Sequence, residues 1–239
     1  MVKAKKDEVV EPSFEGMIEQ DETKAVDEVV GDGVENAGTI LANYSETPDF
    51  DQDDVVIPRL RLAQGLTTEV QDGLARPGQW ILIGYEPEDE LIVVPVAFTK
   101  RREMRDDDTR EVLCFSKDSK VGVGDPGGDC ASCLMSQWVE GDKGKNTPPL
   151  CNFQYSYLMY VVDFEALAAM TFTKSALRTG KLLNTIVAQR GMMKCAVKLS
   201  NSQRKGPNGN YYVPVVNPTN VDDEVLAAAR AKVSGDVVV

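Results

Sequence analysis

The chain of 239 residues contains no histidine. Histidine most often carries out proton transfer near neutral pH, so its absence argues against general acid–base catalysis. The phosphate-binding signature Gly-x-x-x-x-Gly-Lys-Ser/Thr is also absent, and the glycine-rich stretch Val121–Gly124 is not followed directly by a helix, unlike a dinucleotide-binding turn. We therefore expect a protein that is not an enzyme.

Long apolar segments are missing as well. The start, Met1-Val2-Lys3-Ala4-Lys5-Lys6, leads into acidic residues rather than the apolar core of a signal peptide. No apolar run approaches the roughly 20 residues that a membrane-spanning helix needs. We expect a cytosolic protein without a membrane partner, located in the host cytoplasm if the chain is viral.

Acidic residues are unevenly distributed. The net charge is −12, and residues 1–57 contain 16 acidic and 4 basic side chains, whereas residues 58–239 contain 22 of each. Residues 1–56 also have few aromatics and no sustained periodicity, which predicts a disordered acidic tail. One interpretation is a solvated tail that improves solubility. The other is a mobile arm that binds a basic partner or shields a basic groove on its own domain.

The remaining chain is predicted to be mainly β, of the α+β class. Alternating apolar residues and turn signals indicate strands, and two segments have helical periodicity and helix-end residues. We expect an OB-like β-barrel over residues 57–218, interrupted by a loop at 114–151, and a C-terminal helix with a short tail over 219–239. The expected strands are 57–62, 79–85, 91–99, 111–115, 151–162, 167–173, 192–200 and 211–216, and the expected helices are 174–190 and 221–233.

Four of the five cysteines, Cys114, Cys130, Cys133 and Cys151, fall in the expected loop among glycines and prolines. A Cys-x-x-Cys pair with two outlying cysteines predicts one structural Zn²⁺ per chain, held by four thiolates. The alternatives are ordinary buried cysteines, disulfides, or a redox pair, although no βαβ pattern surrounds the pair. Cys195 lies in an apolar alternation and is expected in the core.

Basic and aromatic residues in and beside the expected strands suggest nucleic-acid binding, because single strands bind in positive grooves with stacking aromatics. The alternatives are that Phe153, Tyr155 and Tyr157 form the barrel core, that Trp138 packs on the cysteine loop, and that the lysines and arginines form an ordinary polar face. The candidate contacts are Arg59, Arg61, Lys100, Arg101, Arg102, Arg105, Trp138, Tyr155, Tyr157, Lys194, Lys198, Arg204, Lys205, Tyr211 and Tyr212.

Three stretches resemble zinc-containing single-stranded DNA-binding proteins of tailed bacteriophages. They are Ile57-Pro58-Arg59-Leu60-Arg61-Leu62-Ala63-Gln64-Gly65 with Pro77-Gly78; Gly127-Gly128-Asp129-Cys130-Ala131-Ser132-Cys133 with Gln137-Trp138 and Cys151; and Leu182-Leu183 with Gly209-Asn210-Tyr211-Tyr212-Val213-Pro214. The resemblance covers roughly residues 57–216 and implies an OB fold. Phage proteins of this kind often have an acidic C-terminal tail, whereas the acidic tail here is N-terminal.

Taken together, these features predict a non-sequence-specific single-stranded DNA-binding protein of a bacteriophage, acting in replication or recombination. Its partners would be single-stranded DNA and, through the acidic tail, replication, recombination or transcription proteins. One alternative is a phage transcription regulator whose zinc loop contacts RNA polymerase or promoter DNA. Another is a structural or assembly protein in which zinc only stabilises the loop.

Overall fold

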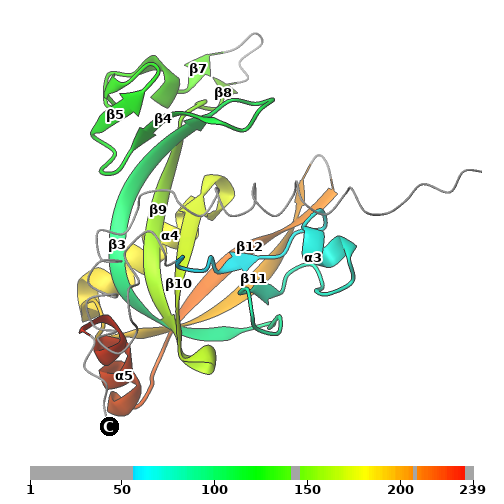
Figure 1. The fold of residues 1–239 in the computed structure, drawn as a ribbon, viewed down its shortest axis with the longest axis vertical. Coiled ribbons are helices and arrows are strands. Elements are labelled where there is room, and N and C mark those ends of the chain that lie inside the picture. Colours follow the sequence, from blue (N-terminus) through cyan, green and yellow to red (C-terminus); the bar gives the residue numbers. More distant parts are fainter. Residues whose placement is uncertain (1–55, 141–145, 207–208, 235–239) are drawn as a thin grey trace, which may run out of the picture. The chain divides into compact units, whose positions relative to one another are not determined.

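The computed structural model describes residues 56–140, 146–206 and 209–234, and the predicted tail at 1–56 lies outside them except for Val56. This part of the chain is mainly antiparallel β-structure with a few helices (Figure 1). The strands are β1 Arg61–Leu62, β2 Trp80–Ile81, β3 Leu91–Arg105, β4 Val112–Ser116, β5 Val121–Gly124, β6 Gly128–Asp129, β7 Val139–Glu140, β8 Asn146–Thr147, β9 Asn152–Val161, β10 Ala166–Thr173, β11 Ala196–Gly206 and β12 Gly209–Thr219. The helices are α3 Thr68–Gln71, α4 Leu177–Arg190 and α5 Asp223–Ser234, with 3₁₀ turns η1 Leu134–Ser136, η3 Val162–Phe164 and η4 Lys174–Ala176.

The long strand β3 organises the main sheet. Along one edge it pairs with β9, which in turn pairs with β10. The other edge is shared: β11 pairs with the start of β3, and β4 pairs with its end. A register shift between Pro95 and Ala97 inserts one extra residue in β3. Because of this bulge, Phe98, Lys100 and Arg102 project from the same face as Val93.

The main sheet is open over the described residues, with no ladder joining β10 to β12. The segment before and through β1 contacts both of these strands. Leu60 donates its backbone N–H to Ala169 of β10, and the Gln64 side chain exchanges hydrogen bonds with the backbone of Tyr212 in β12. The closed barrel predicted from the sequence is therefore not observed; a single extended segment spans the two edges instead.

The main core lies on the Val93 face of the sheet. Its buried side chains come from β3, β9, β10, β11 and β12, together with Trp80 and Leu82. Helix α4 covers this core with Leu183 and Ile186, as the predicted apolar stripe requires. Gly180 permits close packing, because a Cβ there would lie 2.8 Å from Tyr155 Cδ2 and 2.9 Å from Phe172 Cβ.

The opposite face of the sheet forms a second, smaller core. Val94, Val96, Leu158 and Tyr160 are buried there, and Ala229 of α5 packs among them. Helix α5 therefore covers the face that α4 leaves open. It begins at Asp223, close to the start predicted from the acidic residues at its N-terminus.

Most predicted elements are confirmed, with several exceptions. The predicted strand at 79–85 is reduced to Trp80–Ile81, and Tyr85 stacks on Phe164 instead. Met193 lies in the predicted strand at 192–200, but it precedes β11 and packs on the second core. Within the described ranges, no helix combines the length and apolar character needed to cross a membrane.

Candidate metal centre and nucleic-acid interface

The cysteine loop (residues 114–151) extends from the end of β3. Cys114 lies in β4, opposite Met104, and Cys151 immediately precedes β9. Cys130 follows β6, and Cys133 precedes the η1 turn. Two strands that flank β3 therefore supply the outer cysteines, and one tight turn supplies the inner pair.

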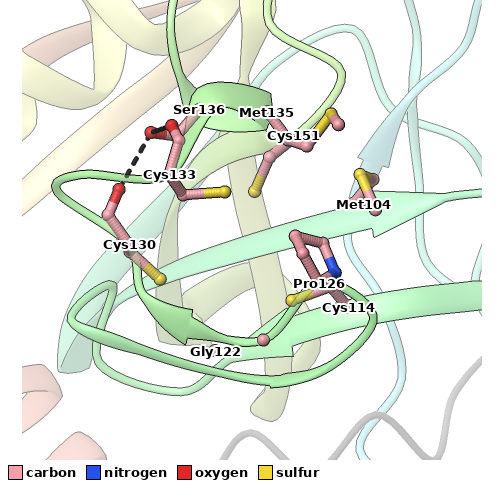
Figure 2. A pocket seen from close by; sticks show the side chains of 10 residues that line it. Met104, Cys114, Gly122, Pro126, Cys130, Cys133, Met135, Ser136 and Cys151 are labelled. Carbon is pink, nitrogen blue, oxygen red and sulfur yellow. Dashed lines mark hydrogen bonds between the residues drawn. The ribbon is translucent and has the colours of Figure 1, made fainter.

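All four cysteines line one pocket, with a cavity volume of about 10 Å³ (Figure 2). That volume is close to the space that one small atom or ion occupies. All four are free thiols, so the disulfide alternative is not observed. Among the residues that the structure describes, no three histidine, cysteine, aspartate or glutamate side chains form a group that could hold a metal ion as they stand. The pocket therefore brings the predicted ligands together without a ready-formed metal site.

Backbone hydrogen bonds fix the turn that bears the inner pair. Ser136 Oγ donates to the carbonyl oxygens of Cys130 and Cys133, both at 2.8 Å (Figure 2). Cys130 donates its N–H to the Lys120 carbonyl, and Cys151 donates its N–H to the Met135 carbonyl. The loop therefore positions its cysteine backbones through its own hydrogen bonds.

Gly122 leaves the space that the Cys114 sulfur occupies. It is buried, and a Cβ built on it would lie 3.0 Å from Cys114 Sγ. Any larger residue would push this sulfur out of its position. The glycine therefore leaves room for the Cys114 side chain at the pocket.

Arg102 is the charged neighbour of this cluster. Burial raises the pKa of the Cys151 thiol, while the positive charge of Arg102 and its hydrogen bond to the thiol oppose that rise. A nearby cation favours the thiolate, which is the form that binds metals. Cys195, by contrast, is buried in the main core, where burial raises its thiol pKa, and it fulfils the prediction of a core residue.

Several predicted nucleic-acid contacts are engaged within the protein. Arg61 forms an ion pair with Glu69, Arg105 with Glu103, and Lys198 with Glu90. Arg101 and Arg102 lie over the rings of Phe115 and Phe153, at 4.8 and 5.3 Å from the ring centroids. Arg59 and Lys100 are exposed. Some of the predicted basic contacts are therefore held by other side chains of the protein, and others face solvent.

Tyr155 and Tyr157 do not offer a stacking surface. They are 8% and 2% exposed, and the Tyr157 hydroxyl donates to Asn184 of α4. Burial also raises the pKa of Tyr157. Their assignment as base-stacking residues is corrected: both belong to the main core, as the alternative reading of this strand required.

The hairpin of β11 and β12 carries four of the remaining candidates, and Lys194 is exposed just before it. Arg204 is paired with Tyr211 and Lys205 with Asn210, and Arg204, Lys205 and Tyr211 are exposed. Tyr212 is less accessible, because its ring lies against Gly78. Trp138 is far from buried, with 65% of its surface exposed on the cysteine loop. Tyr211 and Trp138 are therefore the predicted aromatics that solvent reaches.

The sequence prediction named half of the basic residues in the most basic part of the chain, but it did not recognise the segment as a whole. Residues 166–221, here called the basic segment, contain no aspartate or glutamate. They form β10, α4, β11 and β12, and α4 packs against both β10 and β12. Only Lys198 among its bases has a carboxylate partner in the described residues. A count of charges in windows along the chain would have revealed it. Its bases are Lys174, Arg178, Lys181, Arg190, Lys194, Lys198, Arg204 and Lys205.

No protein-family model matches this chain, and no curated protein or solved structure matches it.

Proposed function

We propose that the protein binds single-stranded DNA through the basic segment, without sequence specificity. The observation that carries this proposal is the absence of acidic residues over β10, α4, β11 and β12. Apart from Lys198, which pairs with Glu90, the lysines and arginines of the segment are exposed and have no carboxylate partner among the described residues. Clustered lysine and arginine side chains provide the phosphate contacts that dominate nucleic-acid affinity. An OB-like arrangement, with the Pro58–Gln64 segment bridging the sheet edges, belongs to the same proposal.

A single strand fits the site better than a duplex because of the aromatic contacts. Tyr211 is the cross-strand partner of Arg204, so a nucleobase can stack while a neighbouring phosphate meets the cation. Stacking requires unpaired bases, which a single strand exposes and a duplex does not. Trp138 offers a second ring on the cysteine loop.

The cysteine loop has a structural role in this proposal. One Zn²⁺ would be held by Cys114, Cys130, Cys133 and Cys151, whose thiolates form a closed four-ligand set with no position left for a reacting group. A cysteine side chain has one rotatable bond to its sulfur, so changes of rotamer can direct the four sulfurs into the pocket that they share. Three features support this assignment: the size of the pocket, the space that Gly122 leaves for the Cys114 sulfur, and the presence of four sulfur ligands.

The DNA proposal is tested by titrating labelled oligo-dT of increasing length, at two salt concentrations. We expect affinity to rise with length and to fall steeply with salt, because phosphate contacts release counterions. An absence of binding at low salt would reject the proposal. Preference for one duplex sequence, or co-purification with RNA polymerase, would favour the transcription alternative instead.

The metal proposal is tested separately by elemental analysis of the purified protein. We expect about one zinc per chain and its loss in the variant Cys133→Ser. Ala131→Ser, in the same turn, is the matched control and should retain zinc. A zinc-free wild-type protein that takes up none when zinc is supplied would reject the metal site and leave the DNA proposal standing.

A further inference from the structure

The position of Arg102 differs from that of a DNA-contacting arginine. It lies on β3 between two cysteine-bearing segments: Ser116, two residues after Cys114, pairs with it on one side, and Phe153, two residues after Cys151, on the other. Met104, two residues along the same face of β3, lines the cysteine pocket. Arg102 therefore projects from the face of β3 that the pocket occupies.

The guanidinium is held in place beside Phe153, the second residue after Cys151. Its Cζ atom lies 5.3 Å from the centroid of the Phe153 ring, which fixes the side chain by a cation–π contact. Its Nε atom is buried and has no hydrogen-bond partner in the described residues. A partly buried cation, with a buried donor that no described residue satisfies, therefore lies on the side of β3 that bears the pocket.

The charge of a zinc–thiolate centre explains this arrangement. Four thiolates around one Zn²⁺ carry a net negative charge of about two units. Burying that charge is costly unless a cation or N–H donors lie beside it. No carboxylate of the described residues pairs with Arg102, so its charge is available to the cysteines.

We propose that Arg102 is a positioning residue of the Cys₄ metal centre, which holds Cys151 and offsets the charge of the thiolate cluster, rather than a DNA contact. This inference rests on the proposed metal site. Outer partners of metal ligands typically change metal affinity by about 10–100-fold when they are removed. Arginine suits the role because its planar fork can stack on Phe153 and donate to sulfur simultaneously.

The test compares zinc release from the full chain in wild type, Arg102→Met, Arg102→Lys and the control Arg101→Met. Arg101 is the adjacent arginine, so it matches Arg102 in length and charge. It lies over Phe115 on the opposite face of β3, away from the cysteine pocket. With excess chromogenic chelator, we expect Arg102→Met to lose zinc about 10–100 times faster than wild type. Arg102→Lys should be intermediate, and Arg101→Met should match wild type.

The possible outcomes separate the proposals. Equal release from Arg102→Met and wild type would overturn the role of Arg102 while leaving the metal site intact. A wild-type protein that binds no zinc would overturn both. If Arg102→Met does not fold, Arg102→Lys decides the matter through the sulfur-to-metal charge-transfer band of the Co²⁺-substituted protein, which should shift; an unchanged band would reject the role. An unchanged zinc release with a weaker salt dependence of DNA binding would assign Arg102 to DNA instead.

Discussion

Arg204 of β11 and Tyr211 of β12 are direct cross-strand partners, so their side chains project from the same face of the hairpin. Tyr211 is 37% exposed, and its ring lies beside Gly206. This pairing combines a phosphate-binding cation with an aromatic ring at the distance of one strand spacing. It is the smallest unit of the proposed interface, and it can be tested by single substitutions.

We predict that Tyr211→Ala weakens oligo-dT binding, because a stacked base contributes about 1–3 kcal/mol. Tyr211→Phe keeps the ring and should bind nearly as wild type. Tyr85→Ala removes another exposed ring, outside the basic segment, and serves as the control. Fluorescence anisotropy at low salt measures all three, and equal affinities for Tyr211→Ala and wild type would exclude this ring from the interface.

A lysine in the basic segment should affect the salt dependence of binding. We expect Lys205→Gln to reduce the slope of log affinity against log salt by about 0.7, the value for one phosphate contact on a single strand. Lys232→Gln on α5 is the matched control, because it removes an exposed lysine from a helix that covers the opposite side of the sheet. Slopes that fall equally in both variants would indicate a general charge effect rather than a local contact.

Deleting residues 1–55 should tighten DNA binding if the acidic arm shields the basic segment. These residues contain 16 acidic and 4 basic side chains, and they precede Pro58 and Leu60, whose backbones are hydrogen-bonded to Ala169 of β10. We expect a lower Kd and a steeper salt dependence than in the full chain. An unchanged Kd would support the solubilising interpretation of the arm.

Gly180→Ala should destabilise the fold even though alanine is the better helix former. Alanine in an exposed helix position would gain about 1 kcal/mol over glycine. Here the added methyl group would lie 2.8 Å from Tyr155 and 2.9 Å from Phe172, and overpacking a core typically costs about 1–3 kcal/mol. Urea unfolding of Gly180→Ala measures the net change, with the exposed Thr185→Ala as control. A stabilised Gly180→Ala would show that the core can yield at this point.

Asp118 makes the turn between β4 and β5 sensitive to acid. Its carboxylate accepts hydrogen bonds from the backbone N–H groups of Lys120 and Val121, which lower its pKa below the ordinary 3.8. A lowered folded-state pKa contributes stability above the unfolded value and loses it as pH falls through the folded value. We expect the NMR-detected carboxyl of Asp118 to titrate below 3.8, and Asp118→Asn to remove this part of the acid sensitivity. A titration at or above 3.8 would contradict the turn geometry.

The sequence predicts the elements of this protein better than their closure. Alternation in β9 and the stripe of Leu183 and Ile186 in α4 identify the core, because burial imposes these periods. The sequence pattern does not show whether Tyr157 faces the core or a ligand, because a tyrosine is suited to both positions. The bulge after Pro95 is not predictable, since a single extra residue leaves no compositional signal while reversing the faces of Lys100 and Arg102.

The candidate site was also predicted only in part from the sequence. The spacing of the four cysteines predicts that they lie together, because a close pair with two outer cysteines is typical of a metal site. In the structure they line one pocket. Individual bases were chosen by their strand positions, and ion pairs such as Arg61–Glu69, which form between separate segments, were invisible at that level. The absence of acid over residues 166–221 was present in the sequence but is a property of a segment, not of a motif.

The position of the cysteine loop on β3 has a consequence for how this chain can change over evolutionary time. The loop leaves through β4 and returns through β9, and both strands pair with the same few residues at the end of β3. Its two ends are thus about two strand spacings apart, or roughly 10 Å. A segment with such closely placed ends can be lengthened, shortened or exchanged as a cassette, because the core beneath it does not need to adjust.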